Sequence, residues 1–259
     1  MSFSASHGNQ LLDEELAYDY DALKVEHDNF VEKLTDEQRH VYDTVLSDVT
    51  NARGGLFFVY GYGGTGFVWK TLSDALCSEG HIVLNVASSG MASLLLPGGR
   101  TAHSRFAIPI NIIEDSTCNI SQGGDLAHLI INSKLIIWDE APMMHKHCFE
   151  ALDRTMRYLL RFLNPLSTEM TFGEKTVVLG GGFRQILPVI PKGTRQDIVG
   201  ASINSSYLWQ NFKVLRLTKN FRLQRLGNYD SAEDINSFSE KWIAGIGDGL
   251  IGGQMMGVQ

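Results

Sequence analysis

The sequence has 259 residues, of which 44% are hydrophobic and 20% charged, a composition typical of a globular protein with room for a sizeable core. Its formal net charge of −7 at first sight argues against a polyanionic partner. No apolar run approaches the roughly 20 residues that cross a bilayer, and the amino terminus lacks the features of a secretory signal. The three cysteines are too widely spaced for a Cys-x-x-Cys metal site, so we expect a reduced, intracellular protein.

The net charge is unevenly distributed along the chain. Residues 1–37 hold ten acidic and two basic residues, whereas residues 141–225 hold thirteen basic and five acidic ones. A nucleic-acid partner for the basic segment therefore stays open, and a solvated basic surface is the alternative.

The first 33 residues predict an acidic arm, either mobile or weakly helical. Thr35 is a good helix N-cap, with Gln38 three residues later and apolar residues at helical spacing after it. A helix over about 36–50 follows from this pattern.

Five short apolar runs then alternate with helical patterns, at residues 55–60, 82–86, 134–138, 175–179 and 213–217. Strands that are apolar on both faces and separated by helices predict an α/β fold, with a parallel sheet covered by helices on both sides. Ligands of such folds bind at the carboxyl ends of the strands, so the residues after each strand are the candidates for a site.

The first predicted strand runs into Gly61-Tyr62-Gly63-Gly64-Thr65-Gly66, and a helix is expected over 67–79. A glycine-rich turn between a strand and a helix lets backbone amides surround a phosphate. The phosphate-loop signature continues with Lys and then Ser or Thr. Here Phe67 and Val68 follow instead, so the loop lacks its cation and its magnesium-binding hydroxyl.

The second strand is followed by a segment rich in small hydroxyl residues, including Ser88 and Ser89, and then by Thr101 and His103. Such residues suit phosphate contacts along a single strand of nucleic acid, and His103 could stack on a base. The alternative for His103 is ordinary packing in a loop.

The third strand ends in Asp139 and Glu140. One carboxylate at the tip of an apolar strand can hold Mg²⁺, and the next can orient and deprotonate an attacking water. A solvated turn is the alternative, but a phosphate-type turn after the first strand favours the functional interpretation.

The last two strands lead to Gln185 and Arg222. Gln185 could sense a terminal phosphate or could satisfy backbone groups in its loop. Arg222 could stabilise charge on a nucleotide or form a surface ion pair.

In this order and spacing, the sequence resembles the petite-integration-frequency (Pif) type ATP-dependent DNA helicases of superfamily one, in particular the plant and Helitron-transposon branch. The stretches that carry the resemblance are 34–38, 61–66, 87–93, 98–106, 137–142, 180–189 and 217–222.

The resemblance implies a RecA-like motor domain of the P-loop NTPase fold, doubly wound, that hydrolyses ATP with Mg²⁺ and moves 5′ to 3′ along single-stranded DNA. It also implies a nuclear location and work in DNA repair and recombination. For the nucleotide it implies adenine recognition by Gln38, phosphate binding by Gly61, Gly63, Gly64, Thr65 and Gly66, and magnesium binding by Asp139. The further roles implied are general base for Glu140, phosphate sensor for Gln185, transition-state arginine for Arg222, and DNA contact for Ser88, Ser89, Thr101 and His103.

Three departures from the family pattern bear on activity. The family's Lys-Thr pair after Gly66 is absent, and Lys70 and Thr71 lie about one turn (roughly 5.4 Å) farther along the helix, where Lys70 could compensate only in part. Gly182 replaces an acid of the family motif. The family's second RecA-like domain is expected to begin near residue 213 and to be largely missing.

We therefore expect an acidic arm over 1–33, a RecA-like ATPase domain over 34–212 and the start of a truncated second domain over 213–259. The predicted function is an ATP-dependent DNA helicase whose activity is impaired in this chain. The alternative is a non-catalytic module that binds single-stranded DNA through its basic segment. An unrelated phosphate-loop kinase or switch gives no role to Gln185 or the His103 segment.

Overall fold

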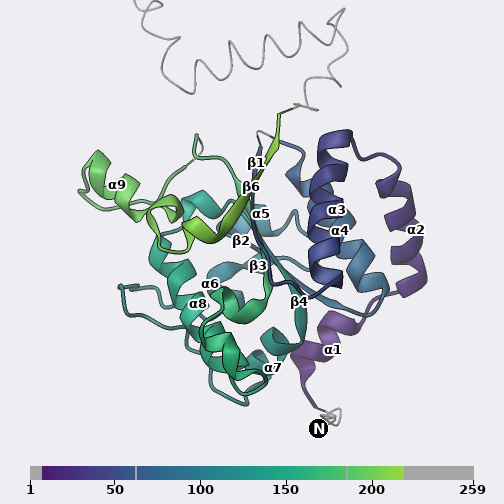
Figure 1. Ribbon diagram of the computed structural model, residues 1–259, viewed down its shortest axis with the longest axis horizontal. Helices are drawn as coiled ribbons and strands as arrows, with labels where there is room; N and C mark the ends of the chain where they lie inside the picture. Colours follow the sequence, from purple (N-terminus) through teal and green to yellow (C-terminus); the bar gives the residue numbers. More distant parts are fainter. Residues whose placement is uncertain (1–7, 62, 185, 219–259) are drawn as a thin grey trace, which may run out of the picture.

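The computed structural model describes residues 8–61, 63–184 and 186–218, which form a single sheet with helices on both faces (Figure 1). The strands are β1 (Leu56–Gly61), β2 (Ile82–Ala87), β3 (Arg100–Thr101), β4 (Ser133–Asp139), β5 (Thr176–Gly181) and β6 (Phe212–Leu217). Their order is β3-β2-β4-β5-β1-β6, and every neighbouring pair is parallel. The predicted doubly wound, RecA-like α/β fold is confirmed, and β3 is a strand that the sequence did not predict.

The helices from residue 36 onward lie before β1 or between successive strands. They are α3 (Asp36–Thr50), α4 (Thr65–Ser78), α5 (Gly90–Ser93), α6 (Ala102–Arg105), α7 (Asp125–Asn132), α8 (Lys146–Leu160) and α9 (Arg195–Ala201). Short 3₁₀ turns are η1 (Ala141–Met143), η2 (Pro165–Thr168), η3 (Thr171–Glu174), η4 (Ile203–Ser205) and η5 (Trp209–Asn211).

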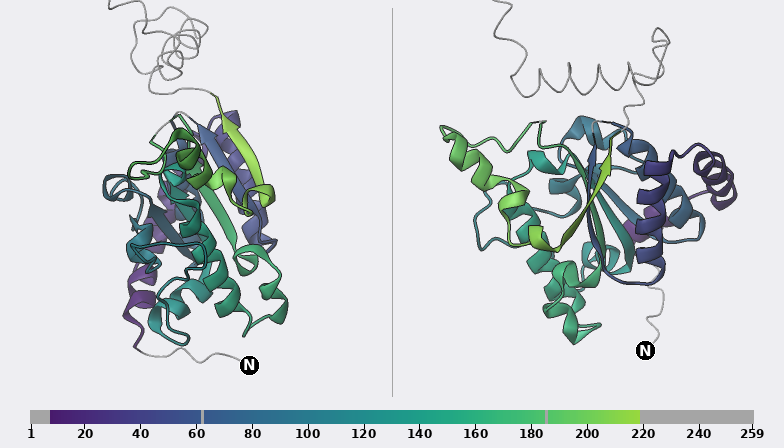
Figure 2. Two further views of the ribbon diagram at one scale, coloured as in Figure 1. Left: turned by 90° about the vertical axis from the view of Figure 1, so that its left-hand side faces the viewer. Right: turned by 45° about the horizontal axis from the view of Figure 1, so that its top comes forward.

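The four inner strands of the sheet, β2, β4, β5 and β1, are buried on both faces because their successive apolar side chains point to opposite sides. In β1, Phe57 and Val59 pack with α3 and α4, whereas Leu56 and Phe58 pack with α7 and α8. Figure 2 shows the two helical layers on either side of the sheet. The core is thus divided into two halves by the sheet.

The α3 helix has the bounds that the sequence predicted. The Thr35 hydroxyl accepts a hydrogen bond from the Gln38 backbone N–H, and the Gln38 side chain accepts one from the Thr35 backbone N–H. This capping box satisfies two amides at the helix start, so a local signal decides where the helix begins. By contrast, α4 begins at Thr65, two residues before the predicted start.

The acidic amino-terminal segment is folded onto the domain where the structure describes it. It forms α1 (Gln10–Leu16) beside α7 and α2 (Tyr20–Val31) against α4 (Figure 1). Glu14 pairs with Arg100 at 3.1 Å, and Glu15 pairs with the buried Arg105 at 2.5 Å. Ion pairs over long sequence separations hold this segment, which is why its local pattern predicted only an arm or weak helix.

The structure also differs from the expected boundary at residue 213. The β6 strand pairs with β1 in continuous register from Leu56 opposite Phe212 to Gly61 opposite Leu217. Residues 213–217 therefore belong to the same sheet as the preceding domain. The rest of the expected second domain, 219–259, lies outside the described residues.

Across the described ranges, no helix combines the length and the apolar character needed to span a membrane.

Candidate functional site

Most of the described loops that carry predicted site residues follow the carboxyl ends of the strands, the edge of the sheet at the top of Figure 1. Ala87, the last residue of β2, lies opposite both Thr101 of β3 and Asp139 of β4. On the other side of β4 and β5, the glycine-rich loop leaves β1 at Gly61. Parallel strands bring their following loops to one edge, so segments from four strands share a site.

The glycine-rich loop ends in the exposed first turn of α4. Gly64 is the N-cap at φ 86°, a left-handed conformation that favours glycine, and no side chain caps the helix. A Cβ on the exposed Gly66 would meet no atom within 4 Å. The uncapped amides and the open space beside them fit a phosphate group.

Gln38, expected to recognise adenine, contacts this loop directly. Its Nε2 donates to the Gly64 carbonyl at 3.0 Å, while its Oε1 accepts from the backbone N–H of Thr35 at 3.2 Å. The buried side-chain amide thus uses both of its ends within the protein and connects α3 to the glycine-rich loop. The role in adenine recognition stays a prediction.

Lys70 and Thr71 do not occupy the place of the absent Lys-Thr pair. Lys70 Nζ forms an ion pair with Glu26 of α2 at 2.7 Å and lies 4.8 Å from the centre of the Phe30 ring. The buried Thr71 hydroxyl donates to the Phe67 carbonyl at 2.8 Å. Both side chains have partners away from the loop.

Asp139 accepts a hydrogen bond from a residue that the sequence did not single out. The indole N–H of the fully buried Trp69 donates to Asp139 Oδ1 at 3.2 Å. Burial raises the pKa of the Asp139 carboxyl, and the bond from Trp69 acts in the opposite direction. Gly180 makes the contact possible, because a Cβ there would lie 2.6 Å from the Trp69 ring and 2.8 Å from Asp139 Oδ1.

The groups at this edge, the uncapped amides of α4 and the Asp139 carboxylate, fit a phosphate better than they fit Mg²⁺. In the described part of the chain, no three His, Cys, Asp or Glu side chains are grouped as metal ligands. Mg²⁺ commonly takes one or two carboxylates and completes its shell with water and substrate phosphates. Asp139 could serve as that carboxylate, but one of its oxygens is bonded to Trp69 and the loop hydroxyl is absent.

Glu140 is held in a defined position next to Asp139. Its backbone has φ 52° and ψ 34°, a left-handed conformation that is unusual for a residue with a side chain. The Ser89 hydroxyl donates to Glu140 Oε2 at 2.7 Å. The hydrogen bond from Ser89 therefore holds one oxygen of the Glu140 carboxylate in place.

The four residues predicted to contact DNA lie near each other, and three of them have internal partners. Ser88 accepts from the Trp138 indole at 3.0 Å, Ser89 bonds Glu140, and Thr101 caps α6. His103 is in α6, and burial lowers its pKa. Contact with DNA stays a prediction for all four.

Two predicted catalytic residues, Gln185 and Arg222, lie outside the described residues. The contacts around the candidate site that the sequence did not predict are those of Trp69, Gly180 and Glu26. A tryptophan one turn into a helix suggests only core packing, and no local pattern relates Glu26 to Lys70, 44 residues away.

A family model described as PIF1-like helicase matches residues 33–255 of the chain. No curated protein matches it in sequence.

Solved structures with the same fold include Pif1 helicases. One, from a study of unwinding at forked double-stranded DNA by two coordinating Pif1 helicases, has a TM-score of 0.64 and 23% identity over 85% of this chain and 49% of that one. Pif1 helicase from Bacteroides, in complex with ADP-AlF3 and single-stranded DNA, has a TM-score of 0.63 and 22% identity over 85% of this chain and 47% of that one. The chain therefore spans about half the length of these solved structures.

Proposed function

The chain belongs to the PIF1-like helicase family, and on that premise we propose that it is the nucleotide-binding, RecA-like part of an ATP-dependent DNA helicase with weakened hydrolysis. The proposed motor acts on single-stranded DNA in the 5′ to 3′ direction, in the nucleus, in DNA repair or recombination.

The observation that carries this proposal is the arrangement at the carboxyl edge. An open first turn of α4, which follows a glycine-rich loop, lies at the same edge as Asp139 and Glu140. In motors of this class, phosphates bind at the loop and the acidic strand end serves hydrolysis. The fold and the order of these segments support the same assignment.

The residues have separate tasks in the proposed mechanism. The amides of the first turn of α4 bind phosphate oxygens, and Gly66 leaves the space for them. Glu140, fixed through one oxygen by Ser89, orients the attacking water and accepts its proton through the other. Asp139 would hold Mg²⁺, which supplies charge neutralisation between the phosphates when bound.

The weakened hydrolysis follows from the loop sequence. A cation about 4 Å from a phosphate charge is worth about 4 kcal/mol at an effective dielectric constant near 20. Loss of that interaction corresponds to about a thousandfold in affinity or rate. Lys70 does not supply it in this arrangement, since it is paired with Glu26.

A second candidate function, a non-catalytic module for single-stranded DNA, is favoured by the charge distribution. The segment 141–225 holds thirteen basic and five acidic residues despite the negative net charge of the chain. Phosphate contacts by such a segment need no nucleotide chemistry, and they weaken steeply as salt increases.

ATP turnover and DNA binding, measured on the same preparation, separate the two candidates. We expect weak ATPase activity that single-stranded DNA stimulates and that Glu140→Gln abolishes, as well as salt-sensitive binding of a fluorescent oligonucleotide. Salt-sensitive binding with no turnover would favour the non-catalytic module. Robust turnover that is insensitive to Glu140→Gln would contradict the assignment of the base.

A further inference from the structure

Lys70 lies beside the open first turn of α4, one helical turn after the point where the phosphate-loop lysine is absent. Gly66 and Lys70 are four residues apart, so they share one face of the helix. Long side chains on a helix point back toward its amino terminus. The flexible stem of Lys70 therefore has a path toward the exposed surface over Gly66.

The position of Lys70 is set by α2. Glu26 binds the ammonium group at 2.7 Å, and the Phe30 ring lies under it at 4.8 Å. Phe30 also contacts Phe67 edge to face, with ring centres 5.2 Å apart. Phe67 is the residue directly after Gly66, so α2 packs against the first turn of α4 as well as against Lys70.

The ion pair is of a kind that a ligand can displace. The Lys70 side chain is 40% exposed and that of Glu26 is 51% exposed. Exposed pairs contribute about 0–1 kcal/mol, because water screens the attraction and both side chains lose freedom. A polyphosphate with several negative charges is a stronger partner for the same ammonium group than one exposed carboxylate.

Space for such a ligand is present on the shared face. A Cβ built on Gly66 meets no atom within 4 Å, and the first-turn amides have no side-chain cap. The neighbouring Trp69 and Thr71 are buried, whereas the Lys70 side chain is partly exposed and can rotate without displacing them.

We infer that Lys70 is the phosphate-binding cation of this chain and that Glu26 competes with the nucleotide for it. This inference rests on the proposed nucleotide site; it adds Lys70 as a ligand of the phosphates and Glu26 as the residue that regulates it. The α2 helix thereby regulates the affinity of the site through Glu26. Nucleotide binding exchanges the Lys70–Glu26 pair for a Lys70–phosphate pair, and Glu26 is released to solvent.

The test is the affinity of the full chain for ADP and for inorganic tripolyphosphate, measured by titration calorimetry at low salt without added metal. Glu26→Gln should tighten both by up to about fivefold, the equivalent of an exposed ion pair. Lys70→Met should weaken both by roughly tenfold or more. The double variant should behave like Lys70→Met, because Glu26 acts only through Lys70.

Two matched controls account for net charge. Glu79→Gln makes the same charge change as Glu26→Gln at the far end of α4, and Lys24→Met removes an exposed lysine of α2. Both control variants should bind ADP and tripolyphosphate with affinities within about twofold of those of the unaltered chain. Thermal unfolding of each variant checks that the fold is intact.

The outcomes distinguish this inference from the proposed function. If the unaltered chain binds ADP and Lys70→Met binds it equally well, Lys70 is not the cation, while the nucleotide site stands. If Glu26→Gln tightens binding even when Lys70 is replaced, Glu26 acts through general repulsion and the competition is refuted. If neither the unaltered chain nor Glu26→Gln binds either ligand, both the inference and the nucleotide site are wrong.

Discussion

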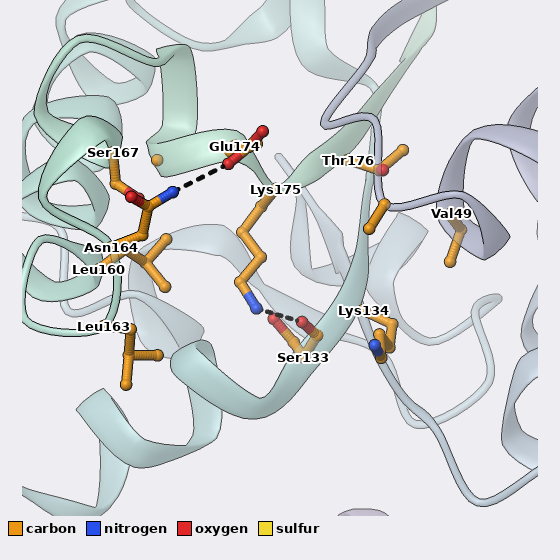
Figure 3. Close-up of a pocket in the computed structure, with 12 residues that line it drawn as sticks. Val49, Ser133, Lys134, Leu160, Leu163, Asn164, Ser167, Glu174, Lys175 and Thr176 are labelled. Atoms are coloured by element: carbon orange, nitrogen blue, oxygen red, sulfur yellow. Dashed lines mark hydrogen bonds between the residues drawn. The ribbon is translucent and has the colours of Figure 1, made fainter. Parts of the chain in front are cut away.

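Two lysines at opposite ends of the sheet show how differently the same side chain can be used. Lys175 lies at the amino ends of the strands and lines a cavity, where its Nζ donates to the Ser133 carbonyl at 2.7 Å (Figure 3). The same Nζ also donates to the Ile131 carbonyl at 2.6 Å. Lys70, near the carboxyl ends, is bound by one exposed carboxylate. We conclude that Lys175 serves the fold, while Lys70 is available to a ligand.

The same contrast holds for the surroundings of the two lysines. At the amino edge, Asn164 donates to Glu174 at 3.4 Å, and Lys175 joins the end of α7 to the start of β5. These contacts link segments of the protein to one another. At the carboxyl edge, the amides of the first turn of α4 have no side-chain cap. Variants at the amino edge should therefore change stability, and variants at the carboxyl edge should change binding.

The largest effect expected on stability is its pH dependence through Lys175. Burial lowers its pKa from 10.5 to about 8, so the folded protein loses this proton before the unfolded chain does. Its contribution to stability therefore increases as the pH rises from about 8 to about 10.5, by up to about 3 kcal/mol. Urea unfolding at several pH values, compared between the unaltered chain and Lys175→Met, measures this difference.

In Lys175→Met that increase should be absent, and ADP affinity should be unchanged. Lys24→Met, which removes an exposed lysine, should keep the pH dependence of the unaltered chain. Equal pH profiles for the unaltered chain and Lys175→Met would contradict the comparison of the two lysines.

A smaller effect is expected for Gly180→Ala at the carboxyl edge. The new methyl would lie 2.6 Å from the Trp69 ring and 2.8 Å from Asp139 Oδ1, in a fully buried strand. Overpacking of this kind costs about 2 kcal/mol. Gly200→Ala is the control, because a Cβ there meets nothing within 4 Å and the residue is helical.

Chemical denaturation of Gly180→Ala and Gly200→Ala measures the free energy of unfolding of each variant and tests this prediction. Gly200→Ala should be neutral or stabilising by up to about 1 kcal/mol. If Gly180→Ala is as stable as the unaltered chain, then Trp69 and Asp139 can separate freely, and their hydrogen bond does not constrain the site.

The smallest expected effect concerns Asp74, one turn after Lys70 on α4. Its Oδ2 has no hydrogen-bond partner among the described residues, and burial raises the pKa of this carboxyl to about 6. The folded protein holds this proton more tightly, so stability should fall as the pH rises from about 4 to about 6. Asp74→Asn removes the charge and should stabilise the protein by about 1 kcal/mol at neutral pH.

Thermal unfolding at pH 4, 6 and 7 tests this prediction. Asp43→Asn, at an exposed position of α3, is the matched control and should leave the profile as it is. A profile of Asp74→Asn identical to that of the unaltered chain would show that Asp74 does not titrate in this range.

The parts of the fold that the sequence predicted depend on local patterns. The α3 helix begins and ends where its capping box and apolar spacing indicate, because the amides at its start are satisfied within four residues. The predicted strands occur where short apolar runs are; β1, β2, β4 and β5 are buried on both faces, whereas the edge strand β6 exposes Lys213 and Arg216. The place of Asp139 and Glu140 at a strand end followed from the same reasoning.

The parts that were missed depend on contacts between distant segments. The folding of the acidic segment onto the domain rests on pairs such as Glu15 with Arg105, 90 residues apart. The bond between Trp69 and Asp139 spans 70 residues and needs a glycine at 180 on a third element. Local periodicity contains no information on such contacts, so the sequence placed the candidate residues at strand ends but did not predict the contacts of their side chains.

The central claim is that the site binds phosphate at a loop weakened by the absence of Lys and Thr after Gly66. Insertion of Lys-Thr between Gly66 and Phe67, followed by titration with ADP and Mg²⁺, tests it most directly. We predict that the affinity rises by about a thousandfold, the equivalent of about 4 kcal/mol. An affinity equal to that of the unaltered chain, in a variant that unfolds at the same temperature, would contradict the account.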